Sequence, residues 1–202
     1  LIISEGITSI GDEALSRNRN LSSISFPSTL TSIGRNAFSY CTGLTALSLP
    51  QGLISIGDEA FYSSGLTELI LPQRLQSIGA GAFAYTALKT ASIPEGVTQI
   101  LNDTFRGCDT LEVVTLPDGV TTIGESAFRS CSALKTVTIP VSVTVIGSYA
   151  FSGCEPETIT YGGSRTQWGQ VEIGTGNACL SDPSKIIFLG AEATPGADGS
   201  TV

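Results

Sequence analysis

The chain has 202 residues, of which 41% are hydrophobic and 14% are charged, and this composition supports a sizeable folded core. It has no histidine, which excludes a Ser-His-Asp triad, a Cys-His dyad and a His-ligated zinc site. Ten basic and eighteen acidic residues give a net charge of −8, with the basic residues scattered, so nucleic acid and anionic membrane surfaces are disfavoured partners. No apolar run reaches the ~18 residues of a membrane-spanning helix.

A repeat of 22 or 23 residues runs through the chain. Its first anchor is an Ile-Gly pair, which becomes Ile100-Leu101 in one unit, and Phe or Leu15 follows at a fixed distance. Its second anchor is an L-x-x-L-x-L-P element. This regularity predicts a solenoid in which each unit forms one coil. The first anchors begin at Ile10, Ile33, Ile56, Ile78, Ile100, Ile123 and Ile146.

Each unit predicts two short strands and an outer turn. In the segment LKTVTIP, Val137 and Ile139 alternate with threonines, a pattern typical of a half-buried strand, and the proline then ends the pairing. A second extended stretch precedes the Ile-Gly pair, with Val120 and Ile123 pointing inward, and the segment after the glycine predicts a helical turn on the outer side. We expect one parallel sheet on the concave face, formed by strands at 68–70, 90–92, 113–115 and 136–138.

Acidic residues often begin the outer turn, as in Asp12-Glu13 and Asp58-Glu59. Favourable charge at the start of a helical turn explains them, and a calcium ladder is the alternative. The ladder fails where other units lack carboxylates, for example at Ala80. Adjacent carboxylates on a helical turn point apart, so neither pair is a general acid/base couple.

Four cysteines occupy one position of the repeat, eight residues after the anchor isoleucine. Ser64 and Thr86 occupy the same position in other units. We therefore predict a column of buried free thiols that hydrogen-bond to the backbone of a neighbouring coil. A redox or zinc role is the alternative, although zinc ligands converge on a point rather than stand in line. The four are Cys41, Cys108, Cys131 and Cys154.

The unit L-x-x-V-x-I-P-x-x-V-x-x-I-G-x-x-A-F-x-x-C resembles the BspA-type leucine-rich repeat, over residues 1–156. The resemblance implies a leucine-rich-repeat solenoid and a bacterial surface protein, because similar repeats are implicated in adhesion to host proteins or other bacteria. The first unit is truncated, so we expect that the solenoid continues upstream in the full protein or was cut there. After the repeats we expect a capping region at 157–190 and a linker or tail at 191–202.

The capping region contains a helix signal and three large aromatic residues. Ser164 and Gln167 form a capping-box pattern that starts a short helix carrying Trp168. Trp168, Tyr161 and Phe188 are large enough to cover the open end of the core. An exposed Trp168 that stacks on a ligand is the alternative.

In the strands predicted for the L-x-x-L-x-L-P elements, the outward positions mostly hold serine and threonine. These residues suit exposed strands through β-propensity and cross-strand pairing alone. The alternative is a broad, weakly polar binding platform. Ile70 and Val113 are apolar exceptions, and exposed apolar residues among polar neighbours are typical of an interface. We predict that any partner binds at Glu68, Ile70, Thr90, Ser92, Val113 and Thr115.

No motif in the sequence predicts a catalytic residue, a cofactor or a metal site. Together with the resemblance, this favours a non-catalytic extracellular interaction or adhesion module of a bacterial surface protein. Its expected partner is a protein or a glycan on a host or bacterial surface. A passive spacer that presents a neighbouring domain is the alternative.

Overall fold

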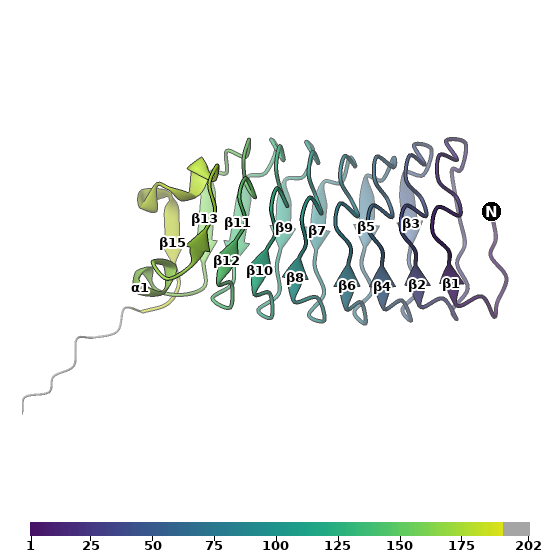
Figure 1. Ribbon diagram of the computed structural model, residues 1–202, viewed down its shortest axis with the longest axis horizontal. Helices are drawn as coiled ribbons and strands as arrows, with labels where there is room; N and C mark the ends of the chain where they lie inside the picture. The colour runs from purple at the N-terminus through teal and green to yellow at the C-terminus, as the bar shows by residue number, and fades with distance from the viewer. Residues whose placement is uncertain (192–202) are drawn as a thin grey trace, which may run out of the picture.

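The computed structural model describes residues 1–191 and forms an elongated solenoid whose coils stack along one axis (Figure 1). Successive coils are joined by parallel strand pairing, as the repeat predicts. The tail expected at 191–202 lies outside the described residues, apart from Ala191. Within the described part, no helix has the length and apolar character that crossing a membrane requires.

The first ladder of strands carries the anchor isoleucines. Each strand is two residues long, and in most of them the isoleucine is buried while its neighbour faces outward. The ladder contains β1 (Ser9–Ile10), β2 (Ser32–Ile33), β4 (Ser55–Ile56), β6 (Ser77–Ile78), β8 (Gln99–Ile100), β10 (Thr122–Ile123), β12 (Val145–Ile146) and β14 (Glu172–Ile173).

The second ladder lies behind the first in Figure 1 and comes from the L-x-x-L-x-L-P elements. Its strands alternate between outward and inward side chains, because one face covers the core and the other faces solvent. It contains β3 (Ala46–Ser48), β5 (Glu68–Ile70), β7 (Thr90–Ser92), β9 (Val113–Thr115), β11 (Thr136–Ile139), β13 (Thr158–Tyr161) and β15 (Ile186–Phe188).

Both ladders are interrupted between the same two coils, so the single sheet expected across 68–70 and 90–92 is wrong at this joint. Elsewhere the anchor glycine lets coils approach so closely that a Cβ on Gly147 would lie 2.5 Å from the backbone nitrogen of Glu125. Leu101 replaces that glycine in the coil that follows the break. Its Cβ needs more room than this spacing leaves, so β8 separates from β6, and β7 of the same coil separates from β5.

The outer segments are turns, but they lack the helical backbone that the sequence predicts. Two residues of each turn, four positions apart, have a left-handed conformation, for example Glu59 (φ 53°) and Ser63 (φ 51°). Every second N–H points toward the next coil, where those of Glu59, Phe61 and Ser63 each donate to a carbonyl oxygen at 2.8 Å. A regular helix would keep these bonds within one coil. The outer turns thus form a third column of hydrogen bonds between coils.

The acidic residues of the outer turns also bridge coils, and they do not begin helical turns as the sequence suggested. Asp12 Oδ1 accepts a hydrogen bond from the backbone N–H of Arg35 at 2.7 Å, and Asp58 Oδ1 accepts one from Ala80 at 2.8 Å. These carboxylates therefore satisfy amide groups of the following coil at the solenoid surface.

A column of phenylalanine rings fills the core behind the outer turns. The rings are buried, and neighbouring rings stack with centroids 5.2 to 5.6 Å apart. The stack continues across the joint between the ladders, where the ring planes of Phe83 and Phe105 differ by 18°. The column consists of Phe38, Phe61, Phe83, Phe105, Phe128 and Phe151.

The cysteine column is buried next to these rings, as predicted, and its thiols are free. Each Sγ donates to a backbone carbonyl oxygen of an earlier coil, for example from Cys131 to Phe105 at 3.1 Å and from Cys154 to Phe128 at 3.0 Å. The hydrogen bonds expected from the shared position are therefore present. They join the thiol column to the backbone of the phenylalanine column.

We expect the four thiols of the cysteine column to resist labelling in the native protein and to react fully after denaturation. Burial raises the pKa of Cys108 from 9.0 to about 11, so little thiolate forms at pH 8. A raised pKa stabilises the fold below about pH 9, and this contribution is lost as the pH rises through about 11. Thiol titration with and without denaturant, together with unfolding at pH 8 and 11, measures both effects. Rapid native labelling of all four cysteines, or stoichiometric bound zinc, would contradict the prediction.

The C-terminal region covers the last coil of the core. Helix α1 (Arg165–Trp168) begins with the predicted capping box, in which Ser164 Oγ accepts from the Gln167 N–H at 3.2 Å and Gln167 Oε1 accepts from the Ser164 N–H at 2.8 Å. Trp168 is buried edge-to-face against Tyr161, which also contacts Phe188. The aromatic plug is confirmed, and an exposed ligand-stacking Trp168 is wrong. The 3-10 helices η1 (Ala178–Leu180) and η2 (Pro183–Lys185) complete this region.

Candidate interaction surfaces

The structure places all six residues of the predicted site on the outward face of the second ladder. Thr90 and Ser92 on β7 lie opposite Val113 and Thr115 on β9, so these four share one continuous sheet face. Glu68 and Ile70 stand on β5, which contacts β7 across the joint without pairing with it. The site is therefore assembled from two sheets, because Leu101 interrupts the ladder between them.

The two apolar residues of this patch are exposed to different degrees. Ile70 has 82% of its surface exposed, and Val113 has 41%. Next to Ile70, the inward residues Leu47 and Leu69 are only half-buried and line a shallow hollow on the face formed by β3 and β5. Apolar surface is therefore accessible on the N-terminal side of the joint. We call Glu68, Ile70, Thr90, Ser92, Val113 and Thr115 the sheet-face patch.

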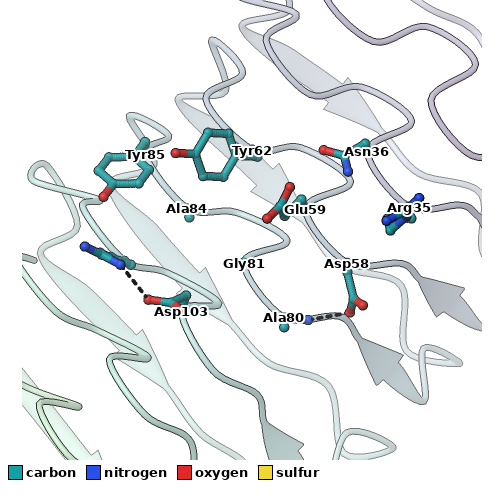
Figure 2. A pocket seen from close by; sticks show the side chains of 11 residues that line it. Arg35, Asn36, Asp58, Glu59, Tyr62, Ala80, Gly81, Ala84, Tyr85 and Asp103 are labelled. Carbon is teal, nitrogen blue, oxygen red and sulfur yellow. Dashed lines mark hydrogen bonds and ion pairs between the residues drawn. The ribbon is translucent and has the colours of Figure 1, made fainter.

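A second surface, which the sequence did not predict, is a pocket of about 420 Å³ on the outer turns (Figure 2). Tyr62 and Tyr85 lie along its rim, and Glu59 and Asp103 lie on either side of Gly81. We call this cavity the tyrosine pocket. It is lined by Arg35, Asn36, Asp58, Glu59, Tyr62, Ala80, Gly81, Ala84, Tyr85, Asp103 and Arg106.

The tyrosine pocket exists because one coil lacks large side chains. Ala80, Gly81 and Ala84 occupy positions where the preceding unit has Asp58, Glu59 and Tyr62. The coils on both sides keep their side chains and form the walls. The signal was present in the sequence as the segment AGAFAY, but the outer turns vary from unit to unit, and this hid the local loss of side chains.

Three tyrosines form a row across the same coils, in which Tyr40 and Tyr85 are exposed and Tyr62 is half-buried. The rings of Tyr40, Tyr62 and Tyr85 contact edge-to-face with centroids 5.4 and 5.3 Å apart. Burial, followed by the neighbouring tyrosines, raises the pKa of Tyr62, so its hydroxyl stays protonated at neutral pH. Guanidinium groups cover the two ends of the row, with Arg17 5.6 Å from the Tyr40 centroid and Arg106 5.9 Å from that of Tyr85.

Several charged groups of the tyrosine pocket are already bound to other groups of the chain. In the tyrosine pocket Arg106 pairs with Asp103 at 3.2 Å, and Asp58 is bound to a backbone amide. Across residues 1–191, no group of three or more cysteine or carboxylate side chains is arranged to hold a metal ion. What both surfaces offer is shape, exposed apolar or aromatic area, and charge.

Comparison with known proteins agrees with this architecture. The family model for the BspA type leucine rich repeat region matches residues 1–112 and 98–171, with six copies. A leucine-rich repeat protein from Bacteroides ovatus has a similar structure, with a TM-score of 0.67 and 24% identity; the match covers 94% of this chain and 64% of that one. The T. pallidum leucine rich repeat protein gives a TM-score of 0.70 at 28% identity, covering 76% of this chain and 75% of that one.

No curated protein matches the chain. The family assignment therefore rests on the family model, whose two matches together span residues 1–171, and it agrees with the parallel solenoid that the structure contains. The solenoid is built on the repeated anchors, namely the Ile-Gly pairs, the stacked phenylalanines and the prolines that follow the strands. The chain belongs to the family of BspA-type leucine-rich repeat regions.

Proposed function

We propose that this chain is a non-catalytic interaction module that works outside the cell, as an adhesion segment of a bacterial surface protein. The observation that carries the proposal is the exposure of Ile70 and Val113 among outward serine and threonine side chains. When a partner covers isolated aliphatic side chains on a flat sheet face, the burial of their apolar surface makes the free energy of binding more favourable. Membership of a leucine-rich repeat family supports an interaction role, and protein is the partner class that suits a flat sheet face.

The sheet-face patch supports weak binding. Full burial of two aliphatic side chains contributes ~3–6 kcal/mol before the cost of association is subtracted. The patch also lacks the tryptophan and arginine anchors that dominate strong interfaces. Single contacts are therefore expected to have micromolar or weaker affinity, and useful adhesion requires many copies on one surface.

Replacing both aliphatic residues by arginine is expected to abolish adhesion without unfolding the chain. Beads coated with the chain are incubated with cultured epithelial cells and, separately, with intact bacteria, and the attached beads are counted. The Ile70→Arg and Val113→Arg double variant should lose attachment, because charge opposes burial of the patch. Val141→Arg with Ile173→Arg, at exposed positions outside the patch, adds the same charge and should attach like the original chain.

Two outcomes of this experiment would count against the proposal. If the double variant attaches as well as the original chain, the sheet-face patch is not the binding surface. If beads coated with the original chain attach to neither cells nor bacteria, the alternative of a passive spacer is favoured. The melting temperature of each variant separates lost binding from lost folding.

A further inference from the structure

The charged groups of the tyrosine pocket do not balance. Arg106 pairs with Asp103 at 3.2 Å, and Arg35 pairs with Glu13 at 3.8 Å. The Asp58 carboxylate accepts a backbone N–H at 2.8 Å. Among the described contacts, the Glu59 carboxylate has neither a hydrogen bond nor an ion pair, although it lines the pocket beside Tyr62 (Figure 2). The group left without a partner is therefore an anion.

Arginine side chains lie over tyrosine rings at several places along the outer turns. Arg106 lies over the Tyr85 ring of the preceding coil, and Arg129 lies 5.6 Å from the ring centroid of Tyr149 in the following coil. These two arginines stand six residues after their anchor isoleucines, and Ala84 stands at the same position of its own coil. The tyrosine pocket thus opens at a repeat position that holds alanine in its own coil and arginine in each of the next two coils.

We propose that the tyrosine pocket binds a basic side chain, arginine or lysine, of a partner protein. The cation enters above Gly81 and Ala84, between Glu59 and Asp103, with the rings of Tyr62 and Tyr85 beside it. Three features favour a cation over a neutral sugar: the unpaired carboxylate, the Tyr85 ring that already attracts a guanidinium group, and the chain's net charge of −8. This site lies on the outer turns and is independent of the sheet-face patch.

The probe for this site is the peptide acetyl-Gly-Arg-Gly-amide, and its citrulline counterpart serves as the uncharged control. The chain is labelled with 3-fluorotyrosine, and its five tyrosines are followed by fluorine NMR during titration. The resonances of Tyr62 and Tyr85 should shift with the arginine peptide. Those of Tyr149, which lies outside the pocket, and of Tyr161, which is buried in the cap, should not. The citrulline peptide should leave all five unchanged.

Two variants and one matched control test the assignment. Glu59→Gln should weaken binding about fivefold, the size of one partly exposed ion pair. Glu95→Gln removes the same charge at a carboxylate outside the pocket and should leave the affinity unchanged. Ala84→Arg supplies the missing guanidinium within the chain and should abolish peptide binding, with its melting temperature checked because Ala84 is buried.

The proposal is overturned if Glu59→Gln binds the arginine peptide like the original chain. It is also overturned if Glu95→Gln weakens binding equally, because the attraction would then come from net charge alone. A shift of Tyr62 and Tyr85 with N-acetylglucosamine, and none with the arginine peptide, would make the cavity a sugar site instead. If Ala84→Arg does not fold, the comparison of Glu59→Gln with Glu95→Gln still decides the question.

Discussion

Replacing Phe128 by alanine is expected to lower the free energy of unfolding by about 3–5 kcal/mol, the range typical of a buried aromatic residue. Phe128 is fully buried and stacks on Phe105 and Phe151, with centroid distances of 5.5 and 5.3 Å. Its removal leaves a cavity in the middle of the column and ends two ring contacts at once. The neighbouring coils cannot close the gap, because hydrogen bonds on the strand and turn sides fix their spacing. Guanidinium unfolding monitored by circular dichroism measures the loss.

Phe128→Leu is the matched control for this prediction, because Leu15 occupies the same position in the first unit. Leucine keeps most of the buried volume, so the loss should be about 1 kcal/mol, typical of a volume-conserving exchange. Equal stability of the alanine and leucine variants would show that the stack does not hold the coils together. Because coils of a solenoid can unfold separately, Trp168 fluorescence should be followed as well, since it reports on the C-terminal cap.

Gly147→Ala is expected to cost about 2–3 kcal/mol, because an overpacked contact must be relieved by backbone movement. The new Cβ would lie 2.5 Å from the backbone nitrogen of Glu125 and 2.7 Å from the carbonyl carbon of Gly124. Neither atom can yield easily, since the N–H of Gly147 donates to Ile123 at 2.7 Å and fixes the two coils together. The equivalent position holds Leu101 in one coil, and both ladders are interrupted there. Thermal unfolding measures the cost.

Gly11→Ala provides the comparison, since Gly11 is the same anchor glycine in the first coil, where a Cβ would meet no atom within 4 Å. Neither glycine has a positive φ, so the two substitutions differ only in the space available. Alanine at position 11 should leave the free energy of unfolding unchanged, or raise it by about 0.4–1 kcal/mol because alanine restricts the unfolded chain. A similar loss in both variants would show that the close approach of the coils is not the reason for glycine at this anchor.

Four features could be predicted from the sequence alone: the repeat length, the parallel solenoid, the inward residues and the buried thiols. These follow from periodicity, because a residue that recurs every 22 or 23 positions in a solenoid stands above its equivalent in the previous coil. Val120 and Ile123 are buried as predicted, and the cap closes with Tyr161 and Trp168. The sheet-face patch was also placed on one side of the solenoid, since alternate residues of a strand face the same way.

The effects of irregularities in the repeat depend on contacts between coils, which the sequence does not reveal. Leu101 reads as a modest departure from the anchor, yet both ladders are interrupted at its coil, because the spacing at the other anchor glycines leaves no room for a Cβ. The outer turns contain left-handed residues and donate hydrogen bonds to the next coil, so the helical turn predicted from the local sequence is wrong. The tyrosine pocket likewise forms between four coils, around Gly81 and Ala84. Periodicity predicts what all coils share, whereas a missing side chain creates a site only through what surrounds it.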